Sequence, residues 1–539
     1  MALSESILQL AEEIIKKLIQ SGNSHPYFLD ELIRQQLKKH KQEYINKPQL
    51  LQAYHKLVKD KKIKPNLEIE RLLQRRWVRS LSGVAVVTVL TKPFKCPGQC
   101  LYCPNEDKMP KSYIKNEPAA HRAFLVNFNP YKQVKTRLAT LKENGHPIDK
   151  VELIVLGGTW SAYSKKYQYW FLKECFRACN NSRPKTQLNS SLKELKVDLK
   201  KEQKKNEKTK CRLVGLTLET RPDCIDLEEI KRIRDLGCTR IELGVQSIYN
   251  DILKKNKRGH LIETTIKATK LLKNAGFKIN YHIMLNLPGS SLKKDYQMFK
   301  TLFSSPDFKP DLLKIYPCAV LKTAELYQDW QKGKYHPYSL KELTDLIVQI
   351  KKIIPYYVRI QRVIRDIPSQ YIEAGVKVSN LRQLIDQKED KACNCIRCRE
   401  IKGNYQPEKK IKIFRQDYKA SDGQEVFLSF EDLKRKNLYA LLRLRLPEKA
   451  EKVLPVLKEA ALIREVHTYG RLMPLAQKNK VYAQHQGLGK KLMQEAEAIV
   501  QKEFPELKQI AVISGVGVRG YYQKLGYRLK EEYMVKKIR

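Results

Sequence analysis

Short apolar runs recur through the middle of the chain, and each ends on glycine or polar residues. The first, GVAVVTVLT (83–91), is continuous and rich in β-branched residues, as a strand buried on both faces should be. Helix-like segments separate it from five further runs: 151–159, 211–220, 239–247, 277–289 and 312–318. This alternation predicts an α/β fold with a parallel (β/α) barrel or partial barrel, whose strand C-termini line the active mouth.

The segments on either side of this pattern differ from it in composition and in predicted secondary structure. Residues 1–80 read as helical with basic runs such as RQQLKKHKQ, which favours a nucleic-acid surface over a merely solvated helix face. The barrel pattern occupies 81–385 and is interrupted by a Lys-rich segment, 180–210, which we expect to be a mobile insertion. A linker, 386–404, then leads to a unit of strands and one amphipathic helix, 405–539.

The charge of the chain is strongly one-sided. It has 104 Lys and Arg against 58 Asp and Glu, a formal net charge of +46. Such an excess predicts a polyanionic partner, with nucleic acid ahead of an anionic membrane surface. There is no run of about 18 apolar residues that could span a bilayer, and the N-terminus is unlike a signal peptide. We expect a soluble, cytoplasmic protein with no membrane partner.

Three cysteines directly follow the first predicted strand: Cys96, Cys100 and Cys103, spaced C-x₃-C-x₂-C. A closed zinc site takes four ligands, whereas three thiolates suit a 4Fe–4S cluster with one open iron. This loop resembles that of the radical S-adenosylmethionine (SAM) superfamily, in which SAM chelates the open iron and is cleaved to a radical. A structural zinc and three free thiols are the alternatives.

A second cysteine triplet, C-x-C-x₂-C, lies on the linker. We interpret Cys393, Cys395 and Cys398 as a structural zinc site, in preference to a second iron–sulfur cluster. Its fourth ligand must come from elsewhere, and His336 and His282 are the candidates.

Glycine and polar residues end several predicted strands, where a barrel binds its ligands. The resemblance implies that Gly157, Gly158 and Thr159 expose backbone groups to SAM, although a glycine pair alone usually marks a turn. Glu219 and Gln246 end later strands and would face SAM or substrate, unless they are ordinary polar residues of the barrel mouth.

The C-terminal unit contains a candidate pyrophosphate site. QHQGLGKKLM (484–493) opens an amphipathic helix, and exposed backbone N–H groups at such a helix start can bind phosphate. The residues we assign to it are Gln484, Gln486, Gly487, Gly489 and Lys490. This order resembles the GNAT acetyltransferase fold, which binds acetyl-CoA in this way.

Two tyrosines follow in VISGVGVRGYYQKLGY (512–527). The same resemblance places Tyr521 and Tyr522 near the thioester, where one of them could protonate the CoA thiolate or orient water. Packing of one of the two rings against the sheet is the alternative.

A radical SAM barrel joined to a GNAT unit resembles the catalytic subunit family of Elongator, which modifies the wobble uridine of tRNA. The motifs that carry the resemblance are SGVAVVTVLTKP, GCTRIELGVQS, LKIYP, IQRVIRDIPS and ISGVGVRGYYQKLGY. The family implies radical attack on acetyl-CoA, addition of the acetyl carbon to carbon 5 of the uridine, and hydrolysis to 5-carboxymethyluridine. An unstacked anticodon base suits such chemistry, an electron donor is needed, and basic N-terminal helices would hold the tRNA.

Two departures from the eukaryotic pattern limit the resemblance. Here the first two cluster cysteines are spaced C-x₃-C, and the linker has its own cysteine triplet. Both indicate a bacterial or archaeal, stand-alone form without Elongator accessory subunits. The rival functions are a protein lysine acetyltransferase with a structural cluster and a non-catalytic RNA-binding scaffold.

Overall fold

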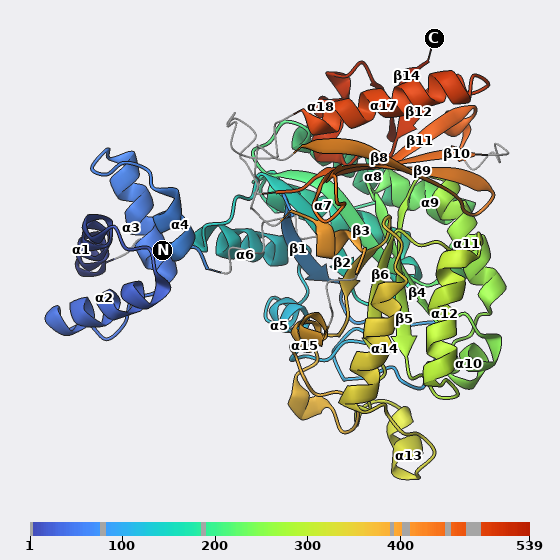
Figure 1. Ribbon diagram of the computed structural model, residues 1–539, viewed down its shortest axis with the longest axis horizontal. Coiled ribbons are helices and arrows are strands. Elements are labelled where there is room, and N and C mark those ends of the chain that lie inside the picture. The colour runs from blue at the N-terminus through green and yellow to red at the C-terminus, as the bar shows by residue number, and fades with distance from the viewer. Residues whose placement is uncertain are drawn as a thin grey trace.

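The structure is a computed structural model that describes residues 4–75, 82–184, 190–388, 393–401, 410–447, 454–470 and 487–538. Figure 1 shows three parts: a small helical bundle, a curled parallel sheet covered by helices, and a second sheet stacked on one end of the first. Among the described residues, no helix is both long and apolar enough to cross a membrane.

The N-terminal part is a bundle of four helices with its own apolar core. They are α1 (Glu5–Ser21), α2 (Pro26–Lys39), α3 (Lys47–Lys59) and α4 (Leu67–Leu73). The bundle meets the rest of the chain through α3 and α6, and Gln74 Nε2 donates to the carbonyl of Gly145 at 2.7 Å. Residues 4–75 carry 14 Lys and Arg against 9 Asp and Glu, so most of the positive charge lies elsewhere.

The first sheet has seven strands in the order β1 to β7, and all neighbouring pairs are parallel. The strands are β1 (Ala85–Leu90), β2 (Lys150–Leu156), β3 (Arg212–Thr220), β4 (Arg240–Gln246), β5 (Lys278–Leu285), β6 (Leu312–Pro317) and β7 (Arg359–Arg362). The partial-barrel prediction is therefore confirmed. The six apolar runs form the first six strands, and β1 and β7 are left as edges within the described residues.

Helices follow the strands of this half-barrel, and most of them lie on its outer side (Figure 1). They are α5 (Pro118–Phe124), α6 (Pro130–Glu143), α7 (Lys165–Cys179), α8 (Leu192–Asn206), α9 (Leu227–Asp235), α10 (Asn250–Lys255), α11 (Ile262–Asn274), α12 (Leu292–Ser304), α13 (Leu326–Gln331) and α14 (Leu340–Lys352). Helices α15 (Leu381–Lys388) and α16 (Ile396–Arg399) follow β7. Gly276 follows α11 with φ 84°, a left-handed conformation that ends the helix and favours glycine.

The expectation of a mobile insertion at 180–210 is wrong for its described residues. Leu192–Asn206 form helix α8, which packs along α7 and begins with a capping box of Ser191 and Glu194. Leu195 and Leu199, four residues apart, are fully buried. This pair gives an otherwise Lys-rich segment one apolar stripe, which is enough to dock it.

The second sheet also has seven strands, in the order β13-β14-β12-β11-β10-β9-β8. The strands are β8 (Ile411–Lys419), β9 (Gly423–Asp432), β10 (Leu438–Pro447), β11 (Ala460–Thr468), β12 (Gln509–Val512), β13 (Arg528–Lys530) and β14 (Tyr533–Lys537). Only the β11–β12 pair is parallel among these described strands. Helix α17 (Leu488–Glu503) packs on β9, β10 and β11, and α18 (Arg519–Gln523) follows β12. The boundary expected at residue 405 lies outside the described residues.

The second sheet sits on the amino ends of the half-barrel strands. Arg464 on β11 donates to the carbonyl of Phe277, just before β5, at 2.7 Å. Gly515 lies so close to β3 that an added Cβ would fall 2.1 Å from the carbonyl oxygen of Val214. Gly515 and Gly517 of the SGVGVRG motif therefore serve the contact between the two units, whereas Gly520 has open space around it.

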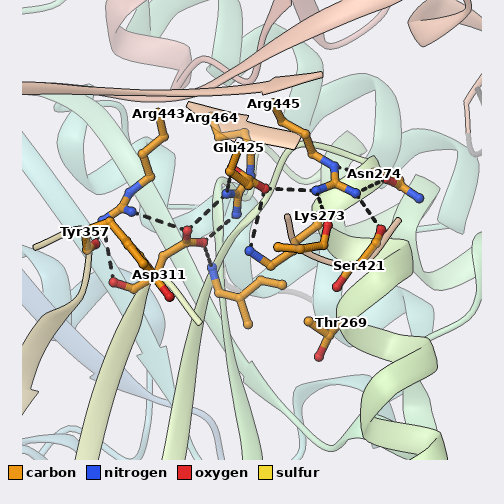
Figure 2. A network of polar contacts seen from close by, with 12 residues as sticks. Thr269, Lys273, Asn274, Asp311, Tyr357, Ser421, Glu425, Arg443, Arg445 and Arg464 are labelled. Atoms are coloured by element: carbon orange, nitrogen blue, oxygen red, sulfur yellow. Dashed lines mark hydrogen bonds and ion pairs between the residues drawn. The ribbon is translucent and has the colours of Figure 1, made fainter. Parts of the chain in front are cut away.

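A buried ionic network crosses this interface (Figure 2). Asp311 and Lys273 come from the half-barrel, whereas Glu425, Arg445 and Arg464 come from the second sheet. Arg464 bonds both carboxylates, at 3.0 Å to Asp311 and 2.8 Å to Glu425. Because charges so buried are stable only when paired, the two units hold one fixed arrangement.

Candidate active site

The cysteine loop lies at the carboxyl end of β1. Cys100 is buried, and Cys96 and Cys103 are half-buried. Their sulfur atoms do not all lie within 4.8 Å of one another, in contrast to those of Cys393, Cys395 and Cys398. Ligands of one ion must converge on a point, whereas cysteines that bind different irons of a cluster stay farther apart. The three sulfur atoms are therefore not arranged as the ligands of one ion.

Arginine side chains surround this loop. Arg258 Nη1 donates to Cys100 Sγ at 3.3 Å, and Arg221 Nη2 donates to the carbonyl of Arg258 at 2.7 Å. Burial opposes ionisation of Cys100, but the charge and hydrogen bond of Arg258, together with Tyr102 and Arg221, outweigh it and lower the pKa of the thiol. Burial and the neighbouring Cys100 raise the pKa of Cys103 to about 12. Arg258 was not singled out from the sequence.

The glycine pair after β2 lies beside the loop. Gly157 has φ 131° and Gly158 has φ 90°. A Cβ added at Gly157 would fall 1.9 Å from Thr91 Oγ1, so no larger residue fits without a shift. Thr159 Oγ1 lies 3.5 Å from Cys96 Sγ. The structure thus brings the predicted SAM-binding turn next to the first cysteine.

Glu219 and Gln246 lie at the carboxyl ends of β3 and β4, as predicted for the barrel mouth. Tyr113 donates to Glu219 Oε2 at 2.6 Å. Gln246 has φ 70°, and its buried Oε1 has no hydrogen-bond partner among the described residues. Arg221 Nη1 is likewise buried without such a partner. These groups fit a polar ligand beside the cysteines, as SAM would be.

The interior of the half-barrel contains a polar cluster that the sequence reasoning missed. Glu242 is fully buried, accepts from Asn280 at 3.2 Å, pairs with Lys314 and lies 3.0 Å from His282 Nε2. Burial opposes its ionisation, but Lys314 and His282 hold the pKa of Glu242 well below its usual range. Charged residues within the apolar strand segments TRIELGVQS and LLKIYPC were the available signal.

A cavity of about 630 Å³ lies inside the half-barrel next to this cluster. Its wall includes Cys103, Glu219, Gln246, His282 and Lys314. The cavity therefore joins the cysteine loop to the polar interior of the sheet.

A second cavity, of about 1030 Å³, lies between the two units. Gly487, Gly489 and Lys490 at the start of α17 line it, with Tyr521 and Tyr522. Gly487 has φ 76° at the helix N-cap, a conformation that favours glycine. Gln484 and Gln486 lie outside the described residues.

The two tyrosines differ in their surroundings. Tyr521 is 40% exposed, and its hydroxyl would lie 3.2 Å from a Cβ added at Gly489. Tyr522 is buried, and its ring packs against Tyr527. Burial raises the pKa of both phenols. Tyr521 is thus placed to meet a ligand at the start of α17, whereas Tyr522 has the surroundings of a core residue.

The two cavities share part of their lining. Val86 on β1, Gln361 on β7, Arg382 and Arg397 belong to both walls. These residues lie at the open edge of the half-barrel, where a closed barrel would pair its first and last strands. The space at the cysteine loop and the space at α17 therefore adjoin at this edge.

The linker cysteines form a separate cluster. The sulfur atoms of Cys393, Cys395 and Cys398 lie within 4.8 Å of one another, as the ligands of one ion should. Hydrogen bonds from the neighbouring thiols hold the pKa of Cys395 well below its usual range. Neither His282 nor His336 belongs to this group of described residues. His282 is instead engaged with Glu242 inside the half-barrel.

The half-barrel with three cysteines after its first strand defines a radical SAM protein. The sequence agrees: residues 92–302 match the Radical SAM superfamily and residues 310–390 match the Radical_SAM C-terminal domain.

Curated relatives identify the family. The chain is 46% identical, over 87% of its length and 88% of the relative's, to a tRNA uridine(34) acetyltransferase of Methanocaldococcus infernus. It is 36% identical to Elongator complex protein 3 of Schizosaccharomyces pombe, over 97% of both chains. The chain belongs to this family of radical SAM enzymes, the tRNA uridine(34) acetyltransferases and Elongator complex protein 3.

A solved structure supports the same assignment. The Methanocaldococcus infernus Elp3 with N-terminal residues 1–46 deleted matches with a TM-score of 0.72 and 44% identity. The match covers 85% of this chain and all of the other.

Proposed function

We propose that the chain uses SAM and acetyl-CoA to form 5-carboxymethyluridine at the wobble uridine of tRNA, without Elongator accessory subunits. The observation that carries this proposal is the shared wall of the two cavities at Val86, Gln361, Arg382 and Arg397. An acetyl group held at α17 must come within reach of chemistry that starts at the cysteine loop. The open edge of the half-barrel offers that meeting place.

Cys96, Cys100 and Cys103 would hold the 4Fe–4S cluster, and Gly157, Gly158, Thr159, Glu219 and Gln246 would bind SAM. When bound, the cluster and SAM supply a radical that removes hydrogen from carbon. Arg258 and Arg221 offset the negative charge that three thiolates bring into a buried site. The glycine pair leaves the backbone beside Cys96 open to a ligand.

The second cavity would bind acetyl-CoA. Gly487, Gly489 and Lys490 place backbone N–H groups and a positive charge at the start of α17, which suits the pyrophosphate. Gln484 and Gln486 belong to the same proposed loop. Tyr521 would orient water or donate a proton to the CoA thiolate when the thioester is hydrolysed.

Arginines that line the half-barrel cavity suit an RNA partner. Arg362, Arg365, Arg382 and Arg397 line the half-barrel cavity and can balance the phosphates of an anticodon loop. The N-terminal helices would add contacts to the tRNA. Cys393, Cys395 and Cys398 would hold a structural zinc beside this wall, since Cys398 and Arg397 both line the cavity between the units.

One anaerobic experiment tests the proposal. The reconstituted enzyme is incubated with reductant, SAM, acetyl-CoA and unmodified tRNA, and the digested RNA is analysed by mass spectrometry. We expect carboxymethyluridine only when every component is present. Deoxyadenosine without modified uridine would contradict the substrate assignment. Acetyl transfer to protein without SAM would favour the lysine acetyltransferase function instead.

A further inference from the structure

Three neighbouring strands of the half-barrel place polar and charged side chains together on its inner face. Glu242 lies on β4, His282 on β5 and Lys314 on β6. His282 and Lys314 are register partners in the sheet, so their side chains leave the same face at the same level. All three are buried, which costs free energy that apolar residues at these positions would not. Packing therefore does not explain this cluster.

His282 is bound at one ring nitrogen and open at the other. Despite its burial, Glu242 is ionised, because Lys314 and His282 hold its pKa well below its usual range. A carboxylate only accepts hydrogen bonds, so His282 Nε2, 3.0 Å from Glu242 Oε2, carries the hydrogen. In the neutral ring Nδ1 then keeps its electron pair, and it lies 3.6 Å from Glu219 Oε1, too far for a hydrogen bond. A proton taken up at Nδ1 would lie between two carboxylates, which favours it.

Lys314 has hydrogen-bond donors to spare. Its ammonium group pairs with Glu242, and such a group has three N–H donors. Lys314 and His282 both line the cavity of about 630 Å³, together with Cys103 of the cysteine loop and Gln361 of the shared wall. Cavities of about 300–1,000 Å³ are typical of sites that bind small molecules. A planar polar ring in this cavity can thus meet both side chains.

The proposed function needs a base at this place. Addition of the acetyl carbon to carbon 5 of uridine forms a carbon–carbon bond and leaves the hydrogen of carbon 5 in place, with an unpaired electron on carbon 6. The double bond between these two carbons returns only after loss of one proton and one electron. The proton lies next to the carbonyl at carbon 4, so a base can remove it while a donor to O4 stabilises the charge that develops.

We propose that His282 Nδ1 removes the proton from carbon 5 and that Lys314 donates a hydrogen bond to O4 of the same uracil. The inference rests on the proposed function and adds two catalytic residues to it. In this step the bond between carbon 5 and its hydrogen breaks and the proton goes to His282. The electron pair of that bond completes the double bond with carbon 6, and the surplus electron leaves to an oxidised iron–sulfur cluster. Glu242 is a positioning residue that holds the imidazole and stabilises its protonated form.

The test follows single turnovers of the reconstituted enzyme on tRNA with hydrogen or deuterium at carbon 5 of the wobble uridine. His282→Gln is the main variant, because a glutamine amide can still donate to Glu242 but is no base. We expect its formation of carboxymethyluridine to fall about 10²-fold, with deoxyadenosine formation within about threefold of wild type. Deuterium should slow this variant by a further threefold or so, because proton loss then limits its rate.

Lys314→Gln should slow carboxymethyluridine formation about tenfold or more and spare deoxyadenosine, since it keeps a donor but loses the charge. His121→Asn, at an exposed position on α5, is the matched control and should change neither product.

A His282→Gln enzyme that forms carboxymethyluridine at the wild-type rate would overturn this assignment alone. So would a slower variant that is indifferent to deuterium, or one that loses deoxyadenosine and carboxymethyluridine equally, as a structural role predicts. Wild-type enzyme that forms deoxyadenosine but no carboxymethyluridine would contradict the proposed function, and this assignment with it.

Discussion

Arg464 Nη1 lies 3.0 Å from Asp311 Oδ1, and this fully buried pair joins the second sheet to the half-barrel. Arg443 lies 3.5 Å from the same carboxylate, so one acidic residue of the half-barrel balances two arginines (Figure 2). The relative position of the two proposed sites thus depends on a polar contact rather than on apolar packing alone.

Asp311→Asn should destabilise the protein by about 3–5 kcal/mol, because Arg464 and Arg443 then keep only Glu425 and Glu465 as partners and the buried network carries one more unbalanced positive charge. Urea unfolding followed by circular dichroism measures this loss. Asp307→Asn, at an exposed position just before, is the matched control and should change stability by less than about 0.5 kcal/mol. Equal effects of the two substitutions would show that the network does not hold the interface.

Lys273 makes the same interface depend on pH. Its Nζ is fully buried 3.6 Å from Glu425 Oε1, and burial lowers its pKa to about 8. An unfolded lysine keeps its proton to about pH 10.4, so between these values the unfolded state binds more protons. The unfolding free energy should therefore rise with pH over this window, by about 1–3 kcal/mol.

Lys273→Met should remove this rise, since it deletes the titrating group and keeps the volume. Urea unfolding at intervals from about pH 7.5 to 10 gives the slope of the unfolding free energy against pH. The slope of the wild type is compared with that of the Lys273→Met variant. Lys436→Met, at an exposed lysine, should keep the wild-type slope. Parallel curves for wild type and the Lys273 variant would disprove the assignment.

Gly157→Ala should weaken SAM binding. The added Cβ would meet Thr91 Oγ1 at 1.9 Å, and φ 131° is strained for alanine, so the turn beside Cys96 must move. Calorimetry with SAM on the reconstituted enzyme measures the loss, which we expect to exceed tenfold, about 1.4 kcal/mol. Gly333→Ala also adds a Cβ at a positive φ, 68°, but with open space around it. SAM affinity should be unchanged there.

The strands of the half-barrel were predictable because strands buried on both faces consist of continuous runs of apolar residues. β7 was not, since RIQR (359–362) is short and half charged. The packing of α8 depends on only two leucines among lysines, and local composition hides such a stripe. The contact of the second sheet with the strand amino ends depends on residues far apart in sequence, such as Arg464 and Asp311.

Some residues of the candidate site were also predictable from local sequence, and others were not. Cysteine spacing, the glycine pair and the glycines at 487 and 489 carry local signals that a sequence can show. Arg258 carries none, and Glu242 shows only as a charge within an apolar strand segment. The roles of both come from Cys100 and Lys314, which lie on other loops or strands. Only the three-dimensional arrangement explains why such charges are buried.

Cys398→Ser should release zinc and leave iron in place. The linker sulfurs are spaced for one ion, and loss of one ligand opens a structural site. Elemental analysis of the purified enzyme measures both metals. Cys318→Ala, at a buried cysteine outside both clusters, should keep both. Iron lost in place of zinc would instead identify the linker triplet as a second iron–sulfur site.

Tyr521→Phe should slow release of CoA from acetyl-CoA about 10²-fold or more, with acetyl-CoA affinity changed less than about threefold. The reason is position: the Tyr521 hydroxyl faces the start of α17 near Gly489, where the thioester end of a bound ligand can lie. A thiol-release assay with tRNA measures the rate. Tyr522→Phe is the matched control, because the buried Tyr522 ring mainly packs. If Tyr522→Phe proved the slower enzyme, the roles assigned to the two phenols would be reversed.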